Sequence, residues 1–89
     1  MGNVVKIGDI GTEHDDCSAT LVITGASTVK VDGAYLARQG DVLASHCSHS
    51  RAIASGSGSV FIEGKPAART GDAVDCGGIV IGGGSVNIG

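Results

Sequence analysis

The sequence predicts a small all-β domain with internal threefold repetition, and three observations support this prediction. A Gly-Asp unit recurs three times, a second pattern leads three times into a short alternating apolar stretch, and no stretch shows a helical period over ten or more residues. At 89 residues the chain has the length of one domain, which we place at residues 1–89.

The Gly-Asp units lie at Gly8-Asp9, Gly40-Asp41 and Gly71-Asp72. Glycine and aspartate together are typical of tight turns, in which the Asp side chain accepts hydrogen bonds from nearby backbone N–H groups. No partner for a reaction recurs beside these carboxylates. We therefore expect each Asp to stabilise the turn that it ends.

The second pattern has the form apolar-x-x-Gly-x-x-Ser/Thr-Val and begins at Val22, Ile53 and Ile79. Each copy leads into an alternating stretch, at 29–33, 60–64 and 86–89, whose period of two and β-branched content predict half-buried strands. We expect three equivalent strands around a pseudo-threefold axis, forming a base. The apolar positions of this base are Val29, Val31, Val60, Ile62, Val86 and Ile88.

The third repeat is divided between the two ends of the chain. The first two alternating stretches continue into a Gly-Asp unit, whereas the third ends at Gly89, and residues 5–9 form a Gly-Asp unit without a preceding strand. The sequence therefore predicts that residues 1–5 lie beside residues 86–89 and close a ring. The ends would then lie within the reach of about four extended residues, or about 13 Å. We also expect an exposed loop at Gly56-Ser57-Gly58.

Composition excludes several classes of protein. A net charge of −3 and an aromatic content of 2% argue against a nucleic-acid binder, which needs basic and stacking surfaces. The N-terminus lacks the features of a secretory signal peptide, and no apolar run approaches the length of a membrane span. We therefore expect synthesis in the cytoplasm without an anchor. The small predicted core and the sixteen glycines indicate that an external staple, such as a metal ion, stabilises the fold.

Potential metal ligands follow the Gly-Asp units at nearly constant offsets. His14 and His46 come five residues after their Asp, and Cys76 comes four residues after its Asp. His49 lies three residues after His46, a spacing that a tight turn can fold onto one ion. His14, His46, His49 and Cys76 form a His3Cys set suited to tetrahedral zinc, with iron as the alternative. Four protein ligands close the coordination shell, so we expect one structural ion rather than a catalytic one.

The other candidate groups have plainer interpretations. Cys17 and Cys47 lie near the same turns but miss the repeat offset, so we expect buried free thiols, with metal ligation as the alternative. Three cysteines are an odd number, which argues against a disulfide framework and favours a reducing compartment. The acidic residues Glu13, Asp15 and Asp16 lack the spacing of ligands in a calcium-binding loop. The glycine run Gly82-Gly83-Gly84 is not followed by the Lys-Ser or Lys-Thr pair of a phosphate-binding loop.

The segment Gly64-Lys65-Pro66-Ala67-Ala68-Arg69-Thr70-Gly71-Asp72 resembles the defining motif of the PAAR-repeat proteins, named for Pro-Ala-Ala-Arg. A degenerate copy, Tyr35-Leu36-Ala37-Arg38, stands in register with it, and the resemblance covers essentially the whole chain. It implies a small β-rich cone that caps the trimeric, VgrG-like β-helical spike of a type VI secretion system. The resemblance also implies zinc near the apex, on His14, His46, His49 and Cys76. The family often has Cys-Pro-x-His where this chain has His46-Cys47-Ser48-His49, which places His46 in the usual cysteine position.

The resemblance carries further expectations about partners and location. The chain would be a non-enzymatic tip without an appended effector domain, bound as a monomer to a homotrimeric spike. It would assemble in the cytoplasm, contact a membrane transiently during delivery, and carry separate effectors where these exist. The alternatives are the tip of a phage or other contractile particle, a small zinc hydrolase with three ligands and an open position, and a soluble zinc carrier.

Overall fold

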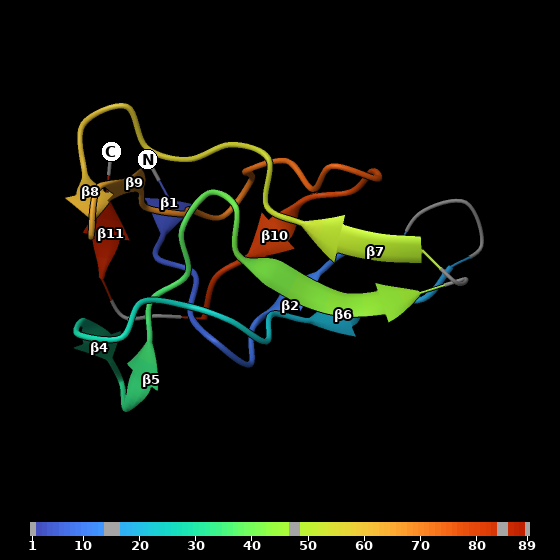
Figure 1. Cartoon of the computed structure of the whole chain (residues 1–89), viewed down its shortest axis with the longest axis horizontal. Helices are drawn as coiled ribbons and strands as arrows, with labels where there is room; N and C mark the ends of the chain where they lie inside the picture. Colours follow the sequence, from blue (N-terminus) through green and yellow to red (C-terminus); the bar gives the residue numbers. More distant parts are fainter. Residues whose placement is uncertain (1, 14–16, 47–48, 84–85, 89) are drawn as a thin grey trace.

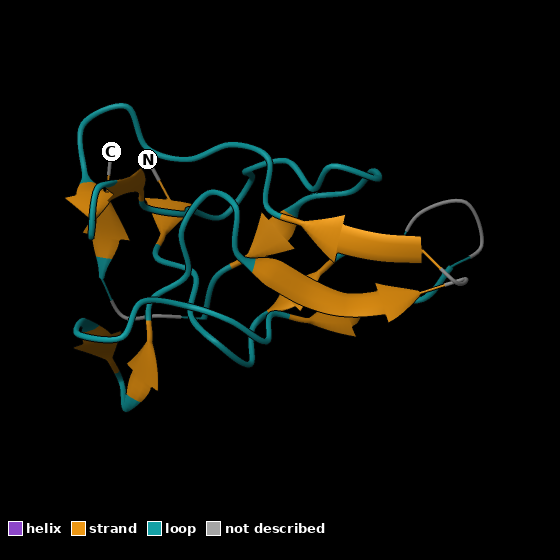
Figure 2. Ribbon diagram, in the orientation of Figure 1, coloured by secondary structure: helices purple, strands orange, loops and turns teal. Residues whose placement is uncertain are grey.

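The protein is built from short antiparallel strands, which confirms the all-β prediction (Figures 1 and 2). The computed structural model describes residues 2–13, 17–46, 49–83 and 86–88, and this part of the chain contains no helix. It accordingly contains no helix that could cross a membrane. The strands are β1 (Gly2–Asn3), β2 (Ile10–Gly11), β3 (Thr20–Leu21), β4 (Lys30–Val31), β5 (Ala34–Tyr35), β6 (Val42–His46), β7 (His49–Ala52), β8 (Phe61–Ile62), β9 (Lys65–Pro66), β10 (Val80–Ile81) and β11 (Asn87–Ile88).

Three equivalent strand pairs lie at one end of the molecule, which we call the hairpin end (Figure 1). Two are hairpins, β4–β5 and β8–β9, with Asp32-Gly33 and Glu63-Gly64 at their turns. The first turn residue has a φ of 54° and the following glycine a φ of 82° in both hairpins. Positive φ at two successive residues is the geometry of the type I′ turn, which suits the twist of paired strands.

The third pair joins the two ends of the chain, as the split repeat predicts. β1 and β11 are antiparallel, with Gly2 opposite Ile88 and Asn3 opposite Asn87. Such partners have Cα atoms about 4.5 to 5.5 Å apart. Figure 1 shows β1 and β11 side by side, next to β8 and β9. The ring prediction is therefore confirmed for the described residues.

A closed triangle of backbone hydrogen bonds lies on the pseudo-threefold axis. Val5 N donates to Ala68 O at 3.2 Å, Ala68 N to Ala37 O at 3.0 Å, and Ala37 N to Val5 O at 2.8 Å. All three residues are almost completely buried. Two small alanines and one valine allow three backbones to meet on a single axis. Related bridges surround the triangle, at Val4–Arg69, Arg38–Ala67 and Lys6–Leu36.

The three Gly-Asp turns follow the same plan. Each Asp accepts a hydrogen bond from the backbone N–H of the residue three positions earlier, at 2.9 Å from Lys6, 2.7 Å from Arg38 and 2.6 Å from Arg69. The expected role of the Asp residues in stabilising turns is confirmed. Each Asp also forms an ion pair with the side chain of that earlier residue, which the sequence analysis did not anticipate.

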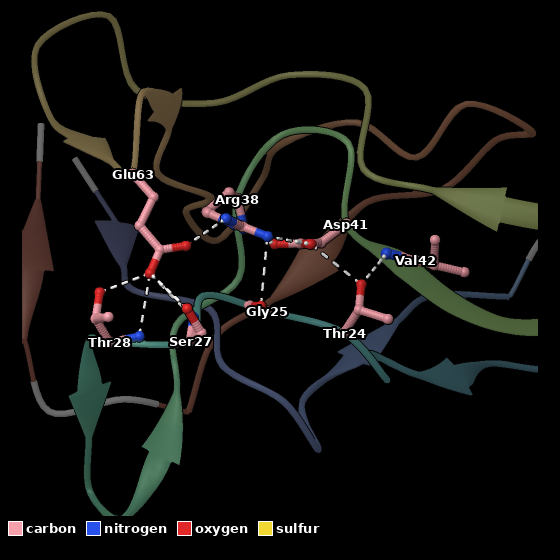
Figure 3. A network of polar contacts seen from close by, with 8 residues as sticks. All are labelled: Thr24, Gly25, Ser27, Thr28, Arg38, Asp41, Val42 and Glu63. Atoms are coloured by element: carbon pink, nitrogen blue, oxygen red, sulfur yellow. Dashed lines mark hydrogen bonds and ion pairs between the residues drawn. The ribbon is translucent and has the colours of Figure 1, made fainter.

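Glu63 links two neighbouring repeats across the ring (Figure 3). Its carboxylate accepts hydrogen bonds from the backbone and hydroxyl groups of Ser27 and Thr28, and it forms an ion pair of 2.8 Å with Arg38 Nη1. The hydrogen bond from the Thr28 hydroxyl is the main cause that lowers the pKa of Glu63 below its ordinary value. Burial alone would raise the pKa of Asp41, but hydrogen bonds from the Arg38 side chain and backbone hold it below its ordinary value.

Two apolar clusters fill the interior. The central cluster consists of Val5, Val22, Ala37, Leu43, Ile53, Ala68, Val74 and Val80. The hairpin-end cluster consists of Val4, Ala26, Leu36, Ile62 and Ala67, with Val31, Val60 and Ile88 packed against it. The expectation of an exposed loop at 56–58 holds for Gly58 and is wrong for Ser57. Ser57 is only 1% exposed, because its hydroxyl accepts hydrogen bonds from Ser59 N and Val60 N and fixes the turn inward.

Candidate metal centre

The β6–β7 hairpin extends toward the end of the molecule opposite the chain termini, which we call the apex (Figure 1). His46 ends β6, His49 begins β7, and the two residues are antiparallel partners. The structure describes the backbone of both. The backbones of His46 and His49 are therefore paired, and the binding of one ion by both side chains stays a prediction. His14, Cys47 and the acidic pair Asp15 and Asp16 lie outside the described residues.

Cys76 lies in a compact turn beside β7. Val74 N donates to Gly78 O at 3.0 Å and Gly77 N to Val74 O at 3.0 Å, which closes the turn around Cys76. The Cys76 side chain is half-buried against the central cluster, and it is not part of a disulfide. The turn is fastened to β7 because Asp75 N donates to Ala52 O at 2.9 Å and Ala52 N donates to Asp75 Oδ1 at 3.0 Å.

The segment that leads to His14 is fastened to the strand that follows the Cys76 turn. Thr12 N donates to Ile79 O at 2.8 Å, and Ile79 N donates to the Thr12 hydroxyl at 3.0 Å. β2, which precedes Thr12, pairs with β10 on one side and with β3 on the other. Thr12 and Ile79 are thus joined directly, and the Cys76 turn is joined to β7 at Ala52. These contacts link the described residues near three of the predicted ligands, whereas His14 itself lies outside the described residues.

Arg51 connects these segments and was missed by the sequence analysis. Its side chain is fully buried, and its two terminal nitrogens donate to the carbonyl oxygens of Gly11, Thr12 and Gly77. Arg51 lies two residues before Ile53, so in an alternating strand it faces the same interior side. The sequence signal that could have identified Arg51 is its position two residues from Ile53, on the interior side of an alternating strand.

Cys17 corrects an expectation of the sequence analysis. It is buried, as predicted, but it is disulfide-bonded rather than a free thiol. A disulfide sulfur does not supply the thiolate that metals prefer. Cys17 therefore leaves the set of alternative ligands, and Cys76 is the cysteine that the apex turn presents.

The donor set fits a zinc ion in its chemistry. Imidazole and thiolate ligands are those of tetrahedral structural zinc sites, and the half-buried Cys76 and the paired residues His46 and His49 would supply three of them. The side chains of His14, His46 and His49 lie outside the described part of the protein, and among the side chains that are described no group of three His, Cys, Asp or Glu residues gathers into a possible metal site. The His3Cys set is therefore the candidate metal centre on the chemistry of its donors.

Two glycines of the run that lacks the phosphate-loop pair, Gly82 and Gly83, have a structural role. A Cβ atom on Gly82 would collide with the carbonyl oxygen of Val4, so only glycine allows these two backbones to approach. Gly83 N donates to Asp9 Oδ2 at 3.0 Å, which ties this segment to the first Gly-Asp turn. The acceptor is a side-chain carboxylate within the protein, so these two glycines act in the fold.

Comparison with known protein families gives one match, to the PAAR motif family, over residues 12–82. A search of curated proteins finds no match. The matched region includes both complete hairpins, the central triangle positions Ala37 and Ala68, and all four predicted ligands. It covers most of the chain. The protein therefore belongs to the PAAR motif family, whose members are structural spike-tip proteins of type VI secretion systems and not enzymes.

Proposed function

We propose that this protein caps a trimeric, VgrG-like spike through its hairpin end and that one structural zinc ion stiffens its apex. The closed ring is the observation that carries the proposal. One chain forms three equivalent units around the triangle of Val5, Ala37 and Ala68. A monomer with this internal symmetry can meet the three identical chain ends of a homotrimer in equivalent ways.

The hairpin end has the features of a surface for strand addition. A β-helical trimer ends in strand edges with unpaired backbone groups, and short strands at the base of a cap can pair with them. Among the six predicted base positions, Val29 and Val86 are exposed, whereas Ile62 is buried and Val31, Val60 and Ile88 pack against the hairpin-end cluster. The exposed positions would therefore contact the spike, whereas the buried ones pack the interior of the protein.

A binding measurement with the purified spike trimer tests the cap. We expect Val29→Glu and Val86→Glu each to weaken binding at least tenfold, because a carboxylate is desolvated in an apolar contact. Leu21→Glu is the matched control, since Leu21 is 50% exposed on β3, outside the hairpins. Equal binding by all three variants would exclude the hairpin end as the interface.

Zinc at the apex is proposed to be held by His14, His46, His49 and the Cys76 thiolate. Bound there, the ion would cross-link three turns that share little apolar core. Elemental analysis should give one zinc per chain, and Cys76→Ala or His46→Ala should lose it. Removal of zinc by a chelator should lower the melting temperature, since metal binding is coupled to folding. Identical melting of loaded and stripped protein would refute the stapling role.

The same geometry fits the tip of a phage or another contractile particle, because those spikes are also threefold. The trimer that binds the hairpin end distinguishes the two. For the secretion system we propose assembly on the spike in the cytoplasm, followed by delivery with it and transient contact with a membrane. Separate effectors would be passengers on the same tip.

A further inference from the structure

We propose that Arg51 is a positioning residue for the apex. Its guanidinium holds the segments that lead to His14 and Cys76 against β7, the strand that begins at His49. The donors are then in place before a metal ion binds. This inference rests on the proposed zinc site, and it assigns to that site a residue that does not touch the metal.

The hydrogen bonds of Arg51 reach three separate parts of the chain. Nη1 donates to Gly11 O at 3.2 Å and to the Thr20 hydroxyl at 3.0 Å, and Nη2 donates to Thr12 O at 2.7 Å and to Gly77 O at 3.2 Å. Thr12 lies two residues before His14, and Gly77 follows Cys76 directly. One planar group therefore fixes the backbone beside two predicted ligands, while its own strand carries a third.

The surroundings of Arg51 are shaped to admit it. A Cβ atom on Gly11 would lie 3.4 Å from both terminal nitrogens of Arg51 and would collide with the Leu43 side chain. A Cβ atom on Gly78 would lie 3.2 Å from Nη2 and 2.8 Å from the Thr12 hydroxyl. Gly78 also has a φ of 85°, which side-chain-bearing residues rarely adopt. Gly78 therefore leaves room beside the guanidinium, whereas the absence of a side chain at Gly11 makes room for Leu43.

The threefold repeat shows that the ring itself does not need an arginine. In the structure Val22, Ile53 and Val80 are equivalent, because each accepts a backbone hydrogen bond from the glycine of a Gly-Asp turn. The third copy is thus shifted by one residue from Ile79, and the residues two positions before Val22 and Val80 are Thr20 and Gly78. Arg51 also forms no ion pair within the described part of the chain, although a buried charge is costly. A guanidinium presents several N–H groups in a fixed plane, and here they donate to three carbonyl oxygens and one hydroxyl. The presence of an arginine at position 51 is thus explained by its hydrogen bonds to the segments of Gly11, Thr12 and Gly77.

Two variants test the role of Arg51 in metal binding. Arg51→Lys keeps the charge but replaces the fork with a single ammonium, and Arg51→Met removes both. Outer groups that orient metal ligands typically change metal affinity by about 10- to 100-fold. We expect a loss of this size for Arg51→Met and a smaller loss for Arg51→Lys, measured by competition with a zinc chelator.

Arg69→Met is the matched control. Arg69 is a partly buried arginine that pairs with Asp72 in a Gly-Asp turn, and it makes no hydrogen bond to the apex turns among the described residues. It should lower stability while leaving zinc affinity within about twofold, a value near the error of such measurements. Cobalt(II) adds a spectroscopic measurement. The tetrahedral thiolate spectrum should weaken in the two Arg51 variants and persist in Arg69→Met.

Hydrogen exchange on the metal-stripped wild-type protein tests the proposal without any variant. The amides of Thr12, Gly77 and Ile79 should remain protected, because Arg51 holds their segments together in the absence of metal. Exchange of these amides at the rate of an unfolded chain, with the triangle amides of Val5, Ala37 and Ala68 still protected, would overturn the proposal.

The two proposals fail in different ways. If the wild-type protein binds no zinc, the metal site is wrong, yet increased exchange at the apex amides in Arg51→Lys would still support the positioning role. If zinc binds with wild-type affinity and an unchanged cobalt spectrum in folded Arg51→Lys and Arg51→Met, the positioning role is wrong and the metal site stands.

Discussion

At the scale of residues, each Gly-Asp turn depends on a carboxylate that accepts a backbone hydrogen bond and also forms an ion pair with a basic side chain. Asp41 is 4% exposed, and it accepts hydrogen bonds from Arg38 N, Arg38 Nε and the Thr24 hydroxyl. Glu63 extends this arrangement to the neighbouring repeat through Arg38 (Figure 3). The arginine of the recurring Ala-Arg element therefore joins two repeats, in addition to its own turn.

Removal of the Asp41 charge should destabilise the fold. We expect Asp41→Asn to lower the free energy of unfolding by roughly 1 to 3 kcal/mol, because it removes one of the two carboxylates that pair with the largely buried Arg38 guanidinium. Urea unfolding of the metal-stripped protein measures this loss without a contribution from the ligands. A change below about 0.5 kcal/mol, the range of surface substitutions, would show that the pair contributes little.

The stability should also depend on pH in a defined direction. The pKa values of Asp41 and Glu63 are both lowered in the folded protein. Such carboxyls contribute stability above their unfolded-state pKa, near about 4, and lose that contribution as the pH falls through the lower folded-state values. Metal-stripped wild-type protein should therefore lose stability below about pH 4. Asp41→Asn should show a shallower decrease, and an equally steep one would assign the acid sensitivity to other groups.

At the scale of elements, the two hairpin turns require glycine for its backbone conformation. A Cβ atom on Gly64 would meet nothing within 4 Å, yet its φ is 82°. Gly58 also faces open space, and its φ lies outside the positive range. A side chain would therefore meet no steric obstacle at either glycine, but only Gly64 has a backbone conformation that strains other residues.

Alanine substitutions at these two positions measure how much a positive φ costs in free energy of unfolding. We expect Gly64→Ala to lower the free energy of unfolding by about 1 to 2 kcal/mol, because it forces alanine into the left-handed region. Gly58→Ala should be neutral or stabilising by up to about 1 kcal/mol. Thermal or urea unfolding compares them, and equal effects would show that the turn tolerates positive φ without a preference for glycine.

The sequence predicted the elements that recur and missed those that occur once. Each Gly-Asp turn and each alternating strand has equivalent copies elsewhere in the chain. Comparison of these copies also revealed that the third repeat is split between the two ends. Arg51 has no equivalent arginine in the other repeats, and the described residues contain one disulfide cysteine, Cys17. Arg51 also acts through residues that are 26 to 40 positions away in the sequence, where no local pattern can indicate contact. The backbone partnership of His46 and His49 was predictable because it is local.

At the scale of the whole molecule, the ring is closed by hydrogen bonds between β1 and β11 rather than by a covalent link. The backbone triangle unites three segments far apart in the sequence, around Val5, Ala37 and Ala68. Each unit therefore depends on both of the others. This arrangement explains how so small a chain, with sixteen glycines, forms a defined core.

The closed ring predicts that the chain can begin elsewhere. If the ends are joined directly, Gly89 and Met1 stand between Ile88 and Gly2, as Asp32-Gly33 and Glu63-Gly64 stand between their strands. Met1→Gly supplies the glycine that the second turn position needs. A permuted chain with this junction, opened between Asp32 and Gly33, should therefore fold and keep the triangle amides protected from hydrogen exchange. The same junction opened between Ser57 and Gly58 should fold poorly, because it cuts the turn that the buried Ser57 hydroxyl holds. Loss of structure in the first permutant, with the second intact, would show that the covalent order of the repeats matters more than their symmetry.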